Sequence, residues 1–186
     1  MVIKIESCAI CGTDLKILKF GNPRCKPPQV IGHEFVGKVI EKDETVKGFQ
    51  IGDRITMATS ISCGKCHFCN RGLGNLCNDL KCISYDFPGA FAEFMAIPAE
   101  GIQRGNVLKI PDNLSSDKGA LSEPLGCVIN SQMISGVGIG KTVAIIGAGL
   151  SGLYTAWCLH QQQQDIILLE ASDHVGGRIR SLCLGE

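Results

Sequence analysis

CGKCHFCNRGLGNLC, residues 63–77, is the stretch that constrains the fold most tightly. Its cysteines are spaced closely enough for one loop to wrap a metal ion, and four thiolates can complete a tetrahedron around Zn²⁺. Because protein ligands would fill every position, no place is left for a substrate, and the pattern predicts a structural zinc site. His67 lies inside the cluster and could compete as a ligand, although the fourth cysteine makes this unnecessary. The four expected ligands are Cys63, Cys66, Cys69 and Cys77.

Cysteine usage and charge narrow the class of protein. Eleven of the 186 residues are cysteine, an odd count, and no secretory signal is visible. In a reducing cytosol this favours metal ligation over disulfides, with reactive or paired cysteines as the alternative. Eighteen basic and eighteen acidic residues cancel, which gives no electrostatic case for nucleic acid or an anionic membrane. No apolar run approaches the roughly 20 residues of a membrane-spanning helix, so we expect a soluble, cytoplasmic protein.

The sequence around the cysteines predicts an all-β domain over residues 1–113. Short β-prone runs are separated by Gly and Pro as far as Pro111, which indicates strands joined by long functional loops. The expected strands are Val2–Ile5, Gln29–Ile31, Phe35–Ile40, Arg54–Ala58 and Ala92–Ile97.

Residues 114–140 predict a connecting helix. Ser115 or Ser116 can cap a helix that runs to about Ser135. Apolar residues recur on one face of this segment at helical spacing. They are Leu121, Leu125, Val128 and Ile129.

The last segment, residues 141–186, predicts the opening of a dinucleotide-binding fold. Thr142–Ile146 is a continuous apolar run typical of a buried parallel strand, and Ile166–Leu169 is a second. Between them lie a glycine-rich turn and a helix, which makes a β-α-β unit. A complete fold of this type needs about five or six parallel strands, so we expect an incomplete Rossmann-type unit. The glycines of the turn that would receive a nucleotide are Gly147, Gly149 and Gly152.

A second metal site is predicted on two separate loops near the start of the chain. Cys11 offers a thiolate and His33 an imidazole, and Glu34 or Glu123 could supply a third ligand or a supporting carboxylate. About three protein ligands leave a catalytic zinc with an open position. A cysteine and a histidine so far apart are a weak signal on their own, because a lone histidine beside a strand is more often structural.

Thr13 and Glu34 are the residues assigned to catalysis. A metal cation lowers the pKa of a coordinated alcohol toward neutrality. Thr13 lies two residues beyond the metal cysteine and can carry the released proton away.

These motifs together resemble the zinc-dependent medium-chain alcohol and polyol dehydrogenases, over about residues 2–149. The resemblance implies that Cys11 and His33 bind catalytic zinc, with two zinc ions per chain. The pair Glu34 and Glu123 resembles the sorbitol and threonine dehydrogenase branches, in which a carboxylate replaces a third cysteine. The motifs, in order, are Cys11-Gly12-Thr13-Asp14, Gly32-His33-Glu34, Gly52-Asp53-Arg54, the four cysteines, and Glu123-Pro124-Leu125.

The same resemblance implies the fold and the reaction. The fold class is mixed β and α/β: a GroES-like β-barrel followed by the incomplete Rossmann-type unit. The reaction is hydride transfer from an alcohol or polyol to NAD. In this family the motif at Gly52–Arg54 marks a turn into a strand, which gives it a structural role.

After Gly149 the sequence resembles a different family, the N-terminal FAD-binding segment of flavin-containing amine oxidases. The resemblance implies that the glycines admit a pyrophosphate to a helix N-terminus. Glu170 would accept hydrogen bonds from the adenosine ribose. An NAD site with a divergent tail is the alternative, because an acidic group at this position suits NAD as well as FAD. The residues implied to wrap the dinucleotide, with the arginine facing a phosphate, are Gly176, Gly177 and Arg178.

Three hypotheses about function follow. The first is a zinc- and NAD-dependent dehydrogenase acting on a small alcohol or polyol. The second is an FAD-binding fragment of amine-oxidase type, and the third is a fusion product that binds zinc without turnover. Dehydrogenases of the resembled family begin earlier and continue further, so we expect a truncated or chimeric chain that is weakly active or inactive alone. The family leaves a homo-oligomer open.

Overall fold

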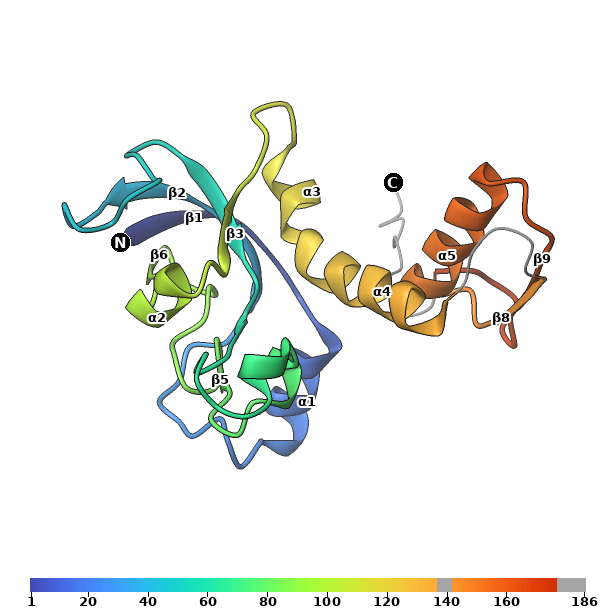
Figure 1. The fold of residues 1–186 in the computed structure, drawn as a ribbon, viewed down its shortest axis with the longest axis horizontal. Helices are drawn as coiled ribbons and strands as arrows, with labels where there is room; N and C mark the ends of the chain where they lie inside the picture. The colour runs from blue at the N-terminus through green and yellow to red at the C-terminus, as the bar shows by residue number, and fades with distance from the viewer. Residues whose placement is uncertain (137–141, 177–186) are drawn as a thin grey trace, which may run out of the picture. The chain divides into compact units, whose positions relative to one another are not determined.

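The computed structural model describes residues 1–136 and 142–176. Contacts divide the chain into two compact units, Met1–Glu123 and Pro124–Glu186, which are described one at a time (Figure 1). The first unit is rich in β-strands, and the second contains most of the helix at Ser122–Ser135 followed by a β-α-β motif. Within the described ranges, no helix is both long and apolar enough to cross a membrane.

The first unit, which we call the barrel after the expected GroES-like fold, is built on a five-stranded antiparallel sheet. The two longest strands, β1 and β2, pair along their whole length, from Val2 opposite Glu41 to Ala9 opposite Glu34. This register brings the end of β1 beside the beginning of β2, which is where the two predicted metal motifs lie. In sheet order the strands are β6 (Phe94–Ala96), β1 (Val2–Ala9), β2 (Glu34–Glu41), β3 (Arg54–Met57) and β7 (Val107–Lys109).

The core of this unit consists of apolar side chains that alternate along the strands. In β2, Phe35 and Val39 are fully or almost fully buried, and Ile3 of β1 lies opposite Val39. Ile55 and Met57 of β3 join the same cluster. Val36, on the opposite face of β2, is also fully buried, so a slip of one residue would exchange side chains between two packed faces, and the packing therefore fixes the register.

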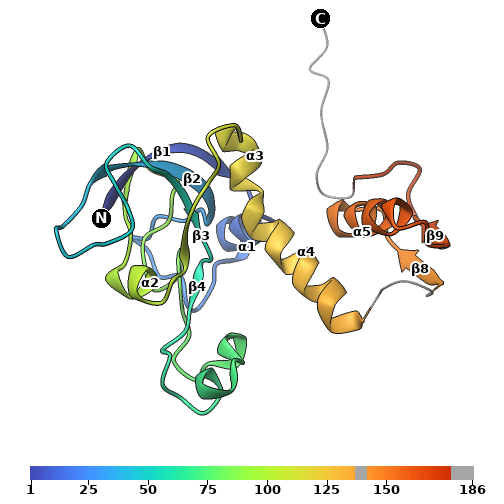
Figure 2. The same cartoon turned by 45° about the horizontal axis from the view of Figure 1, so that its top comes forward.

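The four-cysteine lobe, residues 63–77, lies between two short strands, β4 (Ser60–Ile61) and β5 (Lys81–Cys82). Figure 2 shows it as the green segment that projects from the sheet of this unit. Two 3₁₀ turns shape it, η1 (Cys69–Arg71) and η2 (Gly74–Leu76). One further helix of this unit, α2, spans Ala99–Gln103.

Two predictions for the first unit are wrong. Gln29–Ile31 is not a strand, because the loop at residues 89–91 takes up its backbone groups: the Gly89 and Phe91 N–H groups donate to the carbonyls of Val30 and Ile31. Helix α1 (Gly12–Phe20) occupies a stretch predicted as loop. Its only buried residue is Asp14, so the helix contributes no apolar face to the core.

The predicted helix after residue 115 is two helices. α3 (Ser116–Ala120) ends where the Ser122 hydroxyl donates to the Gly119 carbonyl at 2.6 Å, and α4 (Ser122–Ser135) follows. Of the predicted apolar face, Val128 is buried, whereas Leu121 and Ile129 are each about two-fifths exposed, at 40% and 39%.

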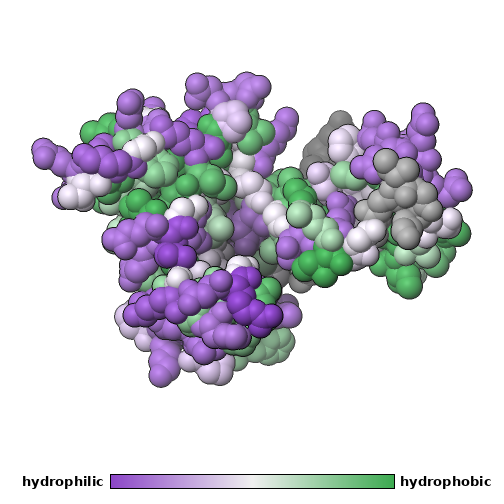
Figure 3. All heavy atoms as spheres, viewed as in Figure 1, coloured by the Kyte–Doolittle hydropathy of each residue, from purple (hydrophilic) through white to green (hydrophobic). Residues whose placement is uncertain are grey.

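The second unit contains the predicted β-α-β motif. Strands β8 (Val143–Ile146) and β9 (Ile166–Leu169) pair in parallel, with helix α5 (Leu150–Gln161) between them in sequence. Ile145 packs with α5 in a small core, but Ile146 is 87% exposed. The expectation of fully buried strands is therefore wrong. Parallel sheets are buried when helices cover both faces, and Figure 3 shows apolar residues on the surface where β8 and β9 lie.

Candidate metal centres and nucleotide-binding turn

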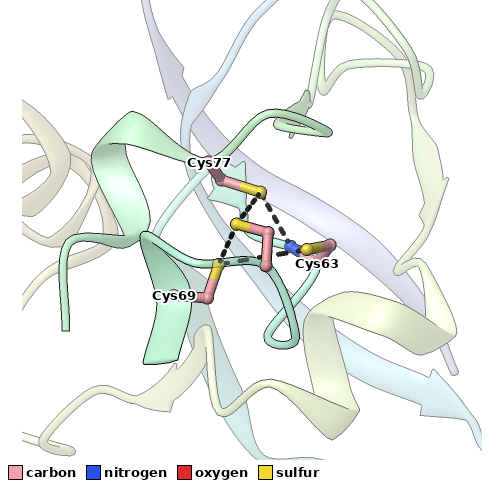
Figure 4. A group of neighbouring side chains, drawn as sticks. Cys63, Cys69 and Cys77 are labelled. Atoms are coloured by element: carbon pink, nitrogen blue, oxygen red, sulfur yellow. Dashed lines mark hydrogen bonds between the residues drawn. The ribbon is translucent and has the colours of Figure 1, made fainter. Parts of the chain in front are cut away.

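The four cysteines of the lobe converge as a zinc site requires (Figure 4). The sulfur of Cys69 lies 3.4 Å from that of Cys66 and 4.0 Å from that of Cys63, and the sulfurs of Cys66 and Cys77 are 3.9 Å apart. A tetrahedron with zinc–sulfur bonds of about 2.3 Å has edges of about 3.8 Å. The observed spacings bracket that edge length, so the residues fit a tetrahedral zinc ion.

Backbone N–H groups of the lobe favour the thiolate form that a metal needs. The Cys63 N–H donates to the Cys77 sulfur at 3.2 Å and acts to lower its pKa, but burial and the neighbouring Cys63 and Cys69 side chains outweigh this and raise the pKa of Cys77 to about 11. The backbone N–H groups of Cys69 and Asn78 lower the pKa of Cys66 to about 6. A thiolate at this position is therefore available near neutral pH.

His67 is exposed and lies outside this group of ligands. Its ring packs edge-on against Phe68, with centroids 5.6 Å apart, and its Nε2 lies 3.4 Å from the Arg71 guanidinium. The competition considered for His67 is therefore not seen.

The second metal group forms where β1 and β2 meet. One ligand atom from each of Cys11, His33 and Glu34 lies within 4.8 Å of the others. The motifs do not lie entirely on loops: Cys11 caps α1, residues 12–14 form its first turn, and Glu34 opens β2. The antiparallel pairing of the two strands thus assembles the group, which we call the three-residue centre.

Gly32 allows His33 to reach this position. Its backbone φ of +96° lies in the left-handed region, and a Cβ there would come within 2.8 Å of the Phe91 ring. Any other residue would be strained and would also collide with Phe91. Gly32 therefore fixes the approach of the chain to the three-residue centre.

Asp14 supports the centre from behind. It is completely buried, and its Oδ2 accepts the Cys11 N–H at 2.8 Å. Its Oδ1 lies 3.6 Å from His33 Nδ1, and neither atom has a hydrogen-bond partner. A carboxylate at this position favours a proton on Nδ1 and leaves Nε2 free for a metal. A thiolate, an imidazole and a carboxylate supported in this way suit zinc.

Sequence reasoning misses the role of Asp14, although a signal is present. An acidic residue three positions after an N-cap residue is a helix-start pattern, and Asp14 stands three positions after Cys11. The contact with His33 is non-local and becomes visible only in the structure.

Glu123 lies close to the three-residue centre but is not one of the converging ligands. Burial raises the pKa of its carboxyl group, the His33 charge opposes this, and the Glu34 charge adds to it. The Thr59 hydroxyl lies 3.3 Å from Glu123 Oε1. Thr13, the predicted proton acceptor, lies half-buried in the first turn of α1.

The glycine-rich turn of the second unit joins β8 to the N-terminus of α5. Gly149 is the N-cap residue of that helix. A Cβ on Gly152 would overlap the Gly147 carbonyl oxygen, so only glycine permits this close approach. Gly149 also forms a β-bridge with Gly176. The other two residues implied to wrap the dinucleotide, Gly177 and Arg178, lie outside the described residues.

Glu170 connects the end of β9 to the glycine-rich turn. Its Oε2 accepts the Ala148 N–H at 2.6 Å, and its Oε1 accepts the Ser172 N–H at 2.9 Å. The backbone N–H groups of Ser172 and Ala148 lower its pKa to about 2. Glu170 is therefore charged at neutral pH and is used by the protein to shape the turn.

A family model described as the alcohol dehydrogenase GroES-like domain matches residues 1–112, more than half of the chain. The chain belongs to the zinc-dependent medium-chain alcohol and threonine dehydrogenase family. A second model, an NAD(P)-binding Rossmann-like domain, matches residues 145–183. The predicted fold class, a GroES-like domain followed by a partial Rossmann-like region, is confirmed.

Relatives of this dehydrogenase-family chain agree with the assignment. L-threonine 3-dehydrogenase of Pyrococcus furiosus is 40% identical over 156 residues, which cover 82% of this chain and 43% of the relative. The enzyme of the same name from Shewanella loihica is 35% identical over 178 residues, covering 94% of this chain and 50% of the relative. The chain thus spans about half the length of the curated relatives it matches.

A solved structure shows the same fold. The structure is of a Sinorhizobium meliloti 1021 protein described as a zinc-binding dehydrogenase and bound to NADP. It is similar to this dehydrogenase-family chain with a TM-score of 0.78 at 39% identity, covering 90% of this chain and 48% of that one. Neither domain match names a flavin or an amine oxidase. The resemblance of the last segment to amine oxidases therefore stays a prediction.

Proposed function

We propose that this chain is the zinc-binding part of an NAD-linked dehydrogenase that oxidises a small hydroxyl compound. The convergence of Cys11, His33 and Glu34 within 4.8 Å, with buried Asp14 behind the histidine, is the observation that carries the proposal. Three protein ligands leave the open position that a catalytic zinc needs. Because the chain spans about half the length of its relatives, hydride transfer is proposed for the whole protein that contains it.

The residues of the centre have distinct roles in this proposal. Cys11, His33 and Glu34 hold the ion, and Asp14 keeps the imidazole in the tautomer that presents Nε2. Bound zinc would lower the pKa of the substrate hydroxyl. Thr13, in the first turn of α1, would relay the released proton, accepting it on its hydroxyl oxygen as its own hydroxyl proton passes to solvent. The carboxylate of Glu34 keeps the site close to neutral overall, together with the Cys11 thiolate.

The substrate class follows from the relatives. Enzymes named L-threonine 3-dehydrogenase act on a hydroxyl-bearing amino acid, and two of them match most of this chain. We therefore propose a small secondary alcohol, polyol or hydroxy amino acid as the substrate. The four-cysteine lobe holds a second zinc ion with a structural role, since its ligands leave no open position.

The glycine-rich turn is proposed to bind the pyrophosphate of NAD. Gly147, Gly149 and Gly152 bring the backbone close to the N-terminus of α5, where N–H groups and the helix dipole stabilise a phosphate. The charged Glu170 disfavours a 2′-phosphate and so favours NAD over NADP. The amine-oxidase resemblance would instead place FAD on the same turn.

Metal analysis of the purified chain tests the proposal. We expect two zinc ions per chain, one of which is lost in a Cys11→Ala variant while the lobe keeps the other. Material with one zinc ion both before and after the Cys11 change would contradict the three-residue centre.

Nucleotide titration tests the second half of the proposal. Quenching of the Trp157 fluorescence by NADH, without yellow colour in the purified protein, is the expected result. A flavin that stays with the protein would assign the turn to FAD and overturn the NAD proposal.

A further inference from the structure

Glu123 lies near the three-residue centre, and its carboxyl group is held in place by a residue other than the three ligands. Its side chain is partly buried, which leaves fewer water molecules to hydrogen-bond the carboxyl oxygens. A carboxylate in such a place needs a hydrogen-bond donor to hold it. The structure shows one donor for it, the hydroxyl of Thr59, 3.3 Å from Oε1.

Thr59 is well placed to hold another residue in position. Only 7% of its surface is exposed, and it lies in the short connection between β3 and β4. Glu123 is far away in sequence, in the first turn of α4. The contact therefore joins two residues of the first unit that are far apart in sequence.

The backbone around Thr59 is held on three sides. The Asn106 side-chain amide donates to the carbonyl of Ala58 at 2.8 Å and to that of Ser60 at 2.9 Å. The Thr59 carbonyl itself accepts the Ile83 N–H at 3.1 Å. With its own and both neighbouring carbonyls engaged, the backbone of Thr59 is held in place.

We propose that Thr59 is a positioning residue, whose hydroxyl holds the Glu123 carboxylate beside the three-residue centre. The inference rests on the proposed catalytic zinc site. It adds a residue that contacts no metal ligand of the centre directly. Groups that orient the surroundings of a metal typically change its affinity by about 10–100-fold. Because an oxygen–oxygen distance of 3.3 Å is long for a hydroxyl donor, we expect the lower end of that range.

Cobalt binding measures this effect without depending on turnover. The whole chain is titrated with Co²⁺ after one equivalent of Zn²⁺, and a Cys11→Ala variant gives the blank for the three-residue centre. Thr59→Val keeps the side-chain shape and removes the donor. We expect it to weaken Co²⁺ binding about 10-fold and to change the visible Co²⁺ spectrum, while Thr59→Ser restores both.

Thr56→Val is the matched control. Thr56 is also buried, with 6% of its surface exposed. Its hydroxyl lies 3.5 Å from that of Ser122, the residue just before Glu123. The control removes an equally buried hydroxyl from the same part of the barrel without touching the carboxylate. We expect it to bind Co²⁺ as the native chain does.

A double-mutant cycle tests whether Thr59 acts through Glu123. Adding Thr59→Val to Glu123→Ala should weaken Co²⁺ binding no further, and fully additive losses would overturn the inference. The inference would also be overturned if Thr59→Val bound Co²⁺ as tightly as the native chain. Equal losses of Co²⁺ affinity in Thr59→Val and Thr56→Val would overturn it as well. Should the native chain give no Cys11-dependent Co²⁺ signal, the proposed function fails, and the inference with it. A cooperative thermal melt like that of the native chain shows in each case that the variant is folded.

Discussion

The four-cysteine lobe takes its ligands from one continuous loop, whereas the three-residue centre takes them from two strands of the barrel. Within the lobe, Leu73 and Leu76 are exposed by 36% and 51%, and only Cys77 among the ligands is buried. The centre instead rests on the β1–β2 ladder and on fully buried Asp14. The comparison indicates that metal organises the lobe, while the barrel organises the centre before any metal binds.

Removing one cysteine ligand of the lobe should lower the thermal stability of the chain more than any other change proposed for it. In Cys66→Ser the tetrahedron loses a thiolate, and the loop has little apolar packing to replace the metal. Loss of a structural zinc ion is among the few changes that cost roughly 4 kcal/mol or more. A thermal melt with paired metal analysis should show one zinc ion fewer and a much lower Tm. Proteolysis should begin within residues 63–77, and a lobe that resists protease without its zinc would contradict this side of the comparison.

His33→Ala should remove metal from the three-residue centre while leaving the chain folded, the reverse of the large loss of stability expected for Cys66→Ser. We expect it to abolish metal binding at the three-residue centre but to leave the barrel folded, because the sheet and core do not depend on the imidazole. Loss of the group facing Asp14 should cost about 1–2 kcal/mol. The melt should therefore shift by a few degrees, with the zinc of the lobe retained. Equal unfolding by His33→Ala and Cys66→Ser would show that the two regions are not separate.

Asp14→Asn tests whether the buried carboxylate of Asp14 sets the tautomer of His33. An asparagine keeps the shape and can still accept the Cys11 N–H, but its amide group can donate toward His33 Nδ1 and so favour the wrong tautomer. We expect metal affinity at the centre to fall by about 10–100-fold, with the zinc of the lobe unchanged. Asp43→Asn is the control, because Asp43 caps Thr45 in an exposed turn. Unchanged metal affinity in Asp14→Asn would show that Asp14 does not support metal binding at the centre.

The two regions also differ in how well the sequence predicts them. The lobe follows from cysteine spacing alone, because all of its ligands are local. For the centre, Cys11 and His33 are a weak signal on their own, which the family resemblance strengthens, since no local pattern reports that β1 and β2 bring the ligands together. Asp14 and Thr59 are missed because their partners are distant in sequence.

Errors in the predicted elements have physical causes of the same kind. Helix α1 is missed because its first residues are assigned to a metal-binding loop, and the helix packs no apolar face on the core, since Leu15, Leu18 and Phe20 are exposed. Gln29–Ile31 has the composition of a strand, yet its backbone pairs with a loop instead. Propensity describes local preference, and in both places tertiary contacts decide the outcome.

Substitution of Ser84, which follows β5 on the C-terminal side of the lobe, should change thermal stability only slightly. Its φ is +75°, in the left-handed region, and its fully buried hydroxyl has no hydrogen-bond partner. Glycine removes both costs but makes the unfolded chain more flexible, so the net gain should be about 1 kcal/mol. For a chain of this size that gain raises Tm by about 2–4 °C.

Ser84→Ala separates the two causes, because alanine removes the hydroxyl and keeps the backbone strain. We expect a thermal melt to rank Ser84→Gly above Ser84→Ala, with both above the native chain. The zinc content of both regions should stay unchanged, since the barrel that carries Ser84 holds its shape without help from either ion. A Ser84→Gly variant that melts below the native chain would mean that the serine makes a contact worth more than its strain. A gain in Tm that disappears when zinc is removed would instead show that the stability of the barrel near Ser84 depends on zinc bound in the lobe. The barrel would then not be independent of the metal in this part of its structure.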